Sequence, residues 1–118
     1  MRKYGLIGYP LGHSFSQKYF SEKFINDLIQ SCVYDNFPLK DINQLPSLIA
    51  VEPDLCGLNV TIPYKSEVLR FLDNIDNEAA EIGAVNVIKI KRSGNKIVLS
   101  GFNSDITGIK DSIKPYFN

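Results

Sequence analysis

The order of apolar and polar positions along the chain predicts alternating strands and helices. Short apolar or alternating runs bounded by Gly, Pro, Asn and Asp are typical of β-strands and occupy residues 3–9, 33–39, 55–62, 84–91 and 96–99. Apolar residues spaced as on one helix face occupy residues 14–29, 41–49, 68–72, 76–82 and 106–113. The alternation predicts an α/β fold, a three-layer sandwich around a mixed, mostly parallel sheet.

Turn and capping residues sharpen this prediction. Residues 92–95, Arg-Ser-Gly-Asn, supply the turn of one late antiparallel hairpin between the last two strands. Asp41 is expected to cap one helix, which must tolerate Pro46 in its first turns. Gly83 is expected to end the helix before it.

Composition and charge narrow the classes of function. The 118 residues suit a single domain, and 13 Lys and Arg against 13 Asp and Glu leave no formal net charge. This balance argues against a nucleic-acid or anionic-membrane surface. Cys32 and Cys56 show neither metal-ligand nor redox spacing, and no apolar run approaches a membrane span. We therefore expect no metal site, no membrane partner and a reduced, cytoplasmic setting.

Polar residues gather where the predicted strands end, and ligands of open α/β sheets bind at the carboxyl ends of strands. Hydroxyl, amide, ammonium and carboxylate groups occur there, a mixture that suits a small ligand with hydroxyls and a carboxylate. A metal site would need more acids or histidines. The clusters lie in residues 12–16, 59–65, 84–87 and 101–105.

Each cluster also has a purely structural interpretation. Ser14 and Ser16 would cap a helix, because serine hydroxyls bind free N–H groups at helix starts. Asn59 and Thr61 alternate with apolar residues and would lie on a half-solvated strand face. Lys65 would be an ordinary solvated lysine.

Two further residues bear on chemistry. Asn86 lies between two valines, so its amide needs a buried partner or a ligand. Asp105 would cap the last helix.

Taken in this order, the clusters resemble the motifs of the substrate-binding domain of the shikimate dehydrogenases. The resemblance covers nearly the whole chain and rests on residues 8–16, 57–65, 83–86 and 101–108. Gln17 and Ser104 depart from the family, which more often has proline and threonine there. Neither departure removes a side chain that the family uses.

The resemblance implies reversible, NADPH-linked reduction of 3-dehydroshikimate to shikimate, on the way to chorismate and aromatic amino acids. Ser14 and Ser16 resemble the pair that holds the substrate carboxylate. Lys65 and Asp105 resemble the catalytic pair, which the resemblance also implies contacts substrate. A carbonyl that receives hydride develops alkoxide character, which a positioned ammonium such as Lys65 stabilises and protonates. A carboxylate such as Asp105 would keep that ammonium oriented and charged. The residues that resemble ligands of the ring hydroxyls are Asn59, Thr61 and Asn86.

The resemblance further implies a substrate-binding domain over residues 1–103 and a connector helix over 104–118 leading to a Rossmann domain that binds NADP. No Gly-x-Gly-x-x-Gly occurs in these 118 residues, so we expect no cofactor-binding residue here and no activity of the chain alone. Loss of that domain would expose apolar surface that the final helix, with Ile106, Ile109 and Ile113, would otherwise help cover, which favours self-association. Two alternatives remain, a quinate/shikimate dehydrogenase domain and a non-catalytic binding module. Retention of Ser14 and Ser16 favours shikimate.

Overall fold

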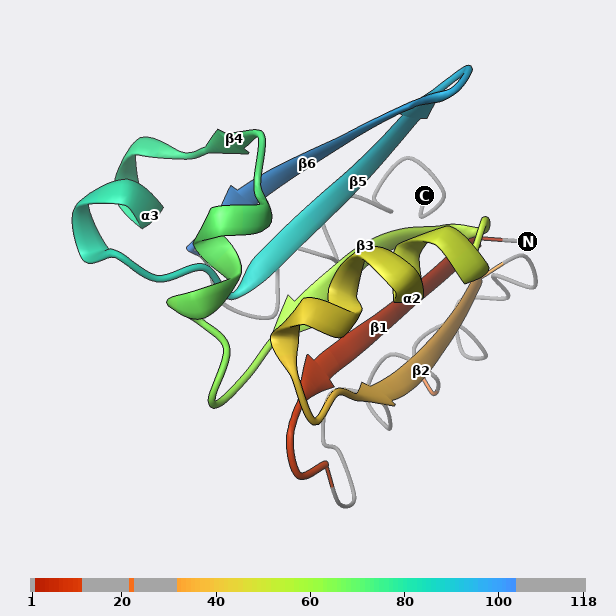
Figure 1. Ribbon diagram of the computed structural model, residues 1–118, viewed down its shortest axis with the longest axis horizontal. Coiled ribbons are helices and arrows are strands. Elements are labelled where there is room, and N and C mark those ends of the chain that lie inside the picture. The colour runs from red at the N-terminus through yellow and green to blue at the C-terminus, as the bar shows by residue number, and fades with distance from the viewer. Residues whose placement is uncertain (1, 12–21, 23–31, 104–118) are drawn as a thin grey trace.

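The computed structural model describes residues 2–11, 22 and 32–103, and its six strands form one sheet (Figure 1). The strand order across the sheet is β2-β1-β3-β5-β6-β4. The strands are β1 (Arg2–Gly8), β2 (Cys32–Pro38), β3 (Leu55–Val60), β4 (Asn74–Ile75), β5 (Val87–Ser93) and β6 (Lys96–Phe102).

The strand pairings confirm the predicted α/β class with a mixed, mostly parallel sheet. β1 pairs in parallel with β2 and β3, and β4 pairs in parallel with β6. β5 is antiparallel to β3 and β6, and with β6 it forms the predicted late hairpin. The helices predicted over 14–29 and 106–113 lie outside the described residues.

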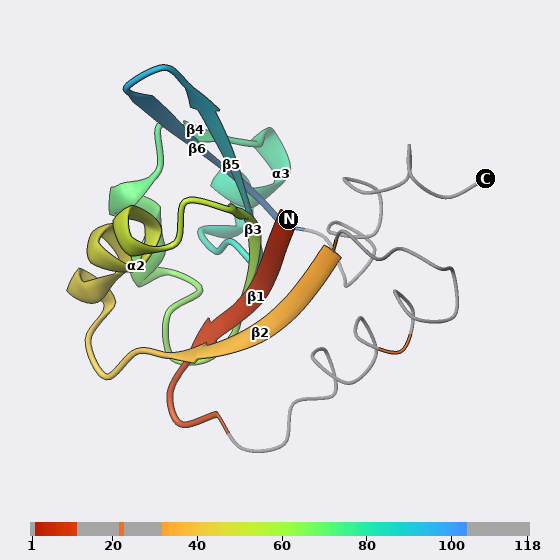
Figure 2. The ribbon, with the colours of Figure 1, turned by 90° about the vertical axis from the view of Figure 1, so that its right-hand side faces the viewer.

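The described helical segments are short. They are the 3-10 helices η1 (Ile42–Gln44) and η2 (Glu67–Phe71) and the α-helices α2 (Leu45–Val51) and α3 (Asn77–Ile82). α2 lies against one face of the sheet (Figures 1 and 2). No helix in the described part of the chain is long and apolar enough to cross a membrane.

Two apolar clusters divide the core between the faces of the sheet. Neighbouring residues of a strand point to opposite faces, and Leu6 and Ile7 belong to different clusters. Ile7 packs in the larger cluster with residues of α2, such as Leu45 and Ile49. Leu6 packs in the second cluster with Tyr4, Cys32, Tyr34 and Val87. We call this smaller group the second cluster. It includes the ladder neighbours of Asn59 on β1 and β5.

The turn end of the hairpin is tied to α2. Gly94 has a φ of 61° in the turn, a conformation that glycine adopts without steric cost. Nη2 of Arg92 donates to the carbonyls of Ile49 and Glu52 at 3.1 and 2.9 Å. These carbonyls belong to the end of α2, where free acceptors need partners. One arginine therefore both caps the helix and fixes the hairpin.

Candidate functional site

The described polar residues singled out in the sequence gather at one end of the strands, where β1 and β3 finish. We call this end the carboxyl edge of the sheet. β1 and β3 run parallel and end there, whereas β5 is antiparallel to β3 and begins there. The register places Asn59, near the end of β3, opposite Val87, the first residue of β5. The segments that follow β1 and β3 and precede β5 therefore meet at this edge.

Main-chain contacts hold the ends of β1 and β3 together. The Thr61 N–H donates to the Ile7 carbonyl at 3.0 Å, and the Tyr9 N–H donates to the Ile62 carbonyl at 3.2 Å. A Cβ atom on Gly8 would come within 2.5 Å of Cγ2 of Thr61 and 2.9 Å of the Ile62 carbonyl oxygen. Glycine therefore permits the approach that brings the segment after β1 to Thr61.

Asn59 is buried, with 7% of its surface exposed. In the ladder it pairs with Leu6 on one side and Val87 on the other, both members of the second cluster. Its Nδ2 donates a 2.7 Å hydrogen bond to the hydroxyl of Tyr34, which is 2% exposed. The half-solvated strand face considered from the sequence is therefore wrong for Asn59, because its side chain lies on the sheet face where the buried second cluster packs. Thr61, beyond the end of β3, is only half-buried.

A tight turn leads from Thr61 to Lys65. The Tyr64 N–H donates to the Thr61 carbonyl at 3.1 Å, and the Tyr64 hydroxyl donates to the Leu39 carbonyl within the core. Burial raises the pKa of Tyr64 above its ordinary value, and neighbouring carboxylates raise it further. The phenol therefore stays protonated at neutral pH and anchors the turn, which leaves Lys65 exposed at the carboxyl edge.

Backbone hydrogen bonds also join Lys65 to Asn86. The Val85 N–H donates to the Lys65 carbonyl at 2.8 Å. The Asn86 carbonyl accepts from the Val60 N–H at 2.8 Å, and the Asn86 N–H donates to the Phe102 carbonyl at 3.0 Å. These bonds draw the residues before β5 against the ends of β3 and β6.

The carboxyl edge thus brings together the predicted site residues that the structure describes, Asn59, Thr61, Lys65 and Asn86. The predicted residues outside the described part are Ser14, Ser16 and Asp105, and their roles stay predictions. Nδ2 of Asn103 donates to the Ala84 carbonyl at 3.0 Å, which holds the chain at this edge just before Asp105. Within the described ranges, no carboxylate lies within ion-pair distance of Lys65.

At the opposite end of the strands, the ionisable groups serve structural roles, as an ion pair and as a partly buried thiol. Nζ of Lys3 lies 2.8 Å from Glu52 and 3.7 Å from Asp35, and the hydrogen bond to Glu52 raises the pKa of Lys3. Burial raises the pKa of the Cys56 thiol, which is therefore protonated at neutral pH and a poor nucleophile. Among the described side chains, no three His, Cys, Asp or Glu gather to hold a metal ion.

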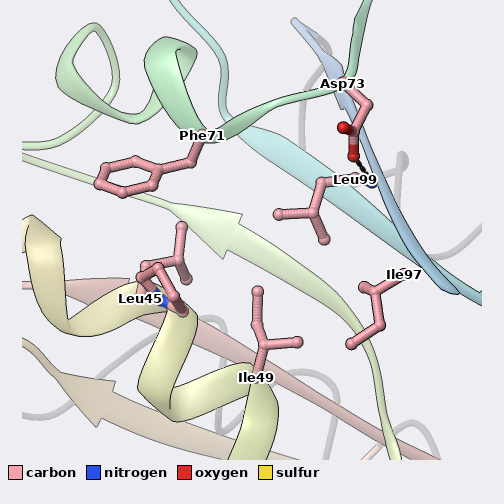
Figure 3. A pocket seen from close by; sticks show the side chains of 7 residues that line it. Leu45, Ile49, Phe71, Asp73, Ile97 and Leu99 are labelled. Carbon is pink, nitrogen blue, oxygen red and sulfur yellow. Dashed lines mark hydrogen bonds between the residues drawn. The ribbon is translucent and has the colours of Figure 1, made fainter. Parts of the chain in front are cut away.

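An apolar pocket of about 270 Å³ lies between α2, η2 and β6 (Figure 3). The carboxylate of Asp73 at this pocket accepts a 2.8 Å hydrogen bond from the Leu99 N–H. Side chains that line the pocket include Leu45, Ile49, Phe71, Ile97 and Leu99. Such a lining does not match a ligand rich in hydroxyls, so the carboxyl edge is the better candidate site.

The sequence model of the shikimate dehydrogenase substrate binding domain matches residues 6–88. The chain belongs to this family. The resemblance drawn from the motifs is thereby confirmed. The matched range includes every predicted site residue except Asp105.

Individual shikimate dehydrogenases show the same relationship. The shikimate dehydrogenase (NADP(+)) of Methanococcus vannielii is 42% identical over 112 residues, which are 93% of this chain and 37% of that protein. The chain thus spans well under half the length of this curated relative.

Two solved structures share the fold. One is the structure of dehydroquinate dehydratase and shikimate dehydrogenase from S. pombe AroM, with a TM-score of 0.80 and 37% identity. The match covers 96% of this chain and 21% of the AroM chain. Shikimate 5-dehydrogenase from Thermus thermophilus, solved in complex with shikimate, has a TM-score of 0.75 and 29% identity. That match covers 98% of this chain and 42% of the Thermus chain.

Proposed function

We propose that this chain is the shikimate-binding part of an NADP-dependent dehydrogenase that interconverts 3-dehydroshikimate and shikimate. The observation that carries the proposal is the convergence of Asn59, Thr61, Lys65 and Asn86 at the carboxyl edge. Two relatives support it, since the Methanococcus protein is named for NADP(+) and the Thermus enzyme was solved with shikimate.

The chemistry of the edge suits a polyhydroxylated ring. Carboxamides and hydroxyls both donate and accept hydrogen bonds, so Asn59, Thr61 and Asn86 are matched to ring hydroxyls. By resemblance, Ser14 and Ser16 take the substrate carboxylate. The exposed Lys65 contributes positive charge at the carboxyl edge.

The redox step requires a proton at the reacting oxygen. NADPH supplies the hydride in the reductive direction, and NADP+ accepts it in the other. As hydride adds to the carbonyl carbon, the C=O π electrons move to oxygen, and the resulting alkoxide takes a proton from the Lys65 ammonium. In oxidation, neutral Lys65 takes the hydroxyl proton back. Asp105 orients the lysine, and no residue of this chain is assigned to the nucleotide.

Binding of shikimate and quinate to the 118-residue chain tests this function. Quinate has a saturated ring and one more hydroxyl, on the carbon that bears the carboxylate. We expect shikimate to bind in the millimolar range and quinate about tenfold more weakly, since a site shaped for one hydroxyl pattern leaves polar groups unpaired with another. Calorimetric titration measures both affinities. Equal affinities would favour the quinate/shikimate alternative, and no binding of either compound would contradict the proposal.

A further inference from the structure

Tyr34 is the hydrogen-bond partner of a predicted substrate ligand, although it is not itself one of the predicted site residues. It lies on β2, separated from Asn59 on β3 by β1. Its hydroxyl is 2.7 Å from Nδ2 of Asn59, and both residues are buried. Any role of this hydrogen bond in ligand binding rests on the proposed function, because it concerns how Asn59 meets the ligand.

The surroundings of Asn59 make this hydrogen bond important. One row of the sheet runs through Leu6, Asn59, Val87 and Phe102, and the apolar members of the row pack in or against the second cluster. A carboxamide among apolar side chains is unfavourable unless its groups are paired. The Tyr34 hydroxyl reaches the amide from within the same cluster.

The direction of this hydrogen bond, from Nδ2 to the phenolic oxygen, sets the orientation of the carboxamide. Nδ2 and Oδ1 are on separate branches of a planar group, so Oδ1 is turned away from the phenol when Nδ2 is bound to it. In the part of the chain that the structure describes, Oδ1 of Asn59 accepts no hydrogen bond. Oδ1 is thus the acceptor of this side chain that remains for a ligand, whereas one Nδ2 hydrogen is taken by the phenol.

We propose that Tyr34 is a positioning residue, which holds the Asn59 carboxamide so that Oδ1 accepts a hydrogen bond from a donating hydroxyl of the bound substrate. Without the phenolic oxygen, Nδ2 loses its partner in the orientation that presents Oδ1 to the ligand, so the carboxamide favours the rotated orientation, which presents no acceptor. Ligand binding must then select the less populated orientation, which lowers the observed affinity in proportion to that population.

Two tyrosine variants of the chain separate this role from general packing. Tyr34→Phe removes the partner of Asn59 while keeping the ring. Tyr4→Phe is the matched control, because Tyr4 is also buried in the second cluster and lies opposite Tyr34 in the β1–β2 register. Urea unfolding measures the stability of each variant, and titration with shikimate measures its affinity.

We expect Tyr34→Phe to weaken shikimate binding about three- to tenfold, the scale of one lost hydrogen bond, and Tyr4→Phe to leave it within about twofold. An unchanged affinity in Tyr34→Phe would overturn the inference while leaving the proposed function standing. Equal weakening in both variants would also overturn it, because the effect would then be packing. A wild-type chain that does not bind shikimate would contradict the proposed function and this inference together.

A measurement on the wild-type chain keeps the inference testable if Tyr34→Phe does not fold. The side-chain amide of Asn59 gives two proton signals in a nitrogen–proton correlation spectrum. One of them should be shifted downfield and exchange slowly with solvent, because it is held by the buried phenol. Two fast-exchanging, unshifted signals would contradict the role of Tyr34 without any ligand present.

Discussion

Replacing Lys65 by alanine is expected to lower turnover by about two powers of ten or more, with a much smaller loss of substrate affinity. The charge of Lys65 is matched to the alkoxide that develops during hydride transfer, so its contribution is made mainly in the transition state. The backbone of Lys65 is held by the hydrogen bond from Val85, so the substitution should leave the carboxyl edge intact.

The measurement requires a protein that joins this chain to the remaining part of a shikimate dehydrogenase, such as that of Methanococcus vannielii. Turnover and the Michaelis constant for shikimate are compared with those of Lys96→Ala, which removes an exposed lysine at the hairpin turn. The control should retain full activity. A raised Michaelis constant with intact turnover in Lys65→Ala would make Lys65 a binding residue only.

The 118-residue chain by itself should not reduce NADP+ with shikimate, whatever its concentration. Hydride transfer requires a nicotinamide held against the substrate, because proximity and orientation supply much of the rate. No glycine-rich nucleotide loop occurs in these residues. The joined protein should therefore form NADPH, whereas the chain alone should form none that the assay can detect.

Formation of NADPH is followed by absorbance with the purified chain and with the joined protein. The joined protein is the control, because its activity would show that the chain supplies a competent substrate site. Measurable turnover by the purified chain would contradict this division of roles. An inactive joined protein would instead favour the non-catalytic binding module.

Local signals in the sequence predicted much of the fold, because they depend on neighbouring residues. Asp76 accepts a hydrogen bond from the Glu78 N–H at the start of α3, and Gly83 ends α3 with a φ of 76°. Asp41 accepts from the Asn43 N–H at 2.8 Å, as expected of a helix cap. Pro46 falls in the first turn of α2, where its missing N–H costs nothing.

Elements that depend on distant partners were predicted less well. The helical run at 68–72 is the 3-10 helix η2, in which the Leu69 N–H donates to the Ser66 carbonyl three residues earlier. The two-residue strand β4 was missed, because it is defined by pairing with β6. β5 begins at Val87 instead of residue 84, since the Val85 N–H bonds to Lys65 and not to a neighbouring strand.

The candidate site shows the same limit. Motifs predicted Asn59 as a ligand, but Tyr34 carries no signal of its own, because its partner is 25 residues away. The alternation of β2 indicates only that Tyr34 shares a strand face with Asn36. The phenol and the carboxamide come within 2.7 Å because of the parallel order β2-β1-β3, which single-strand patterns do not contain.

Titration of the isotope-labelled chain with shikimate, followed by backbone amide chemical shifts, tests the central claim most directly. The carboxyl edge should respond, with the largest changes at Asn59, Thr61, Lys65 and Asn86. The apolar pocket beside Leu45 and the opposite end of the strands should stay unchanged. No shifts at millimolar shikimate, or shifts confined to that pocket, would contradict the assignment of the carboxyl edge as a shikimate site.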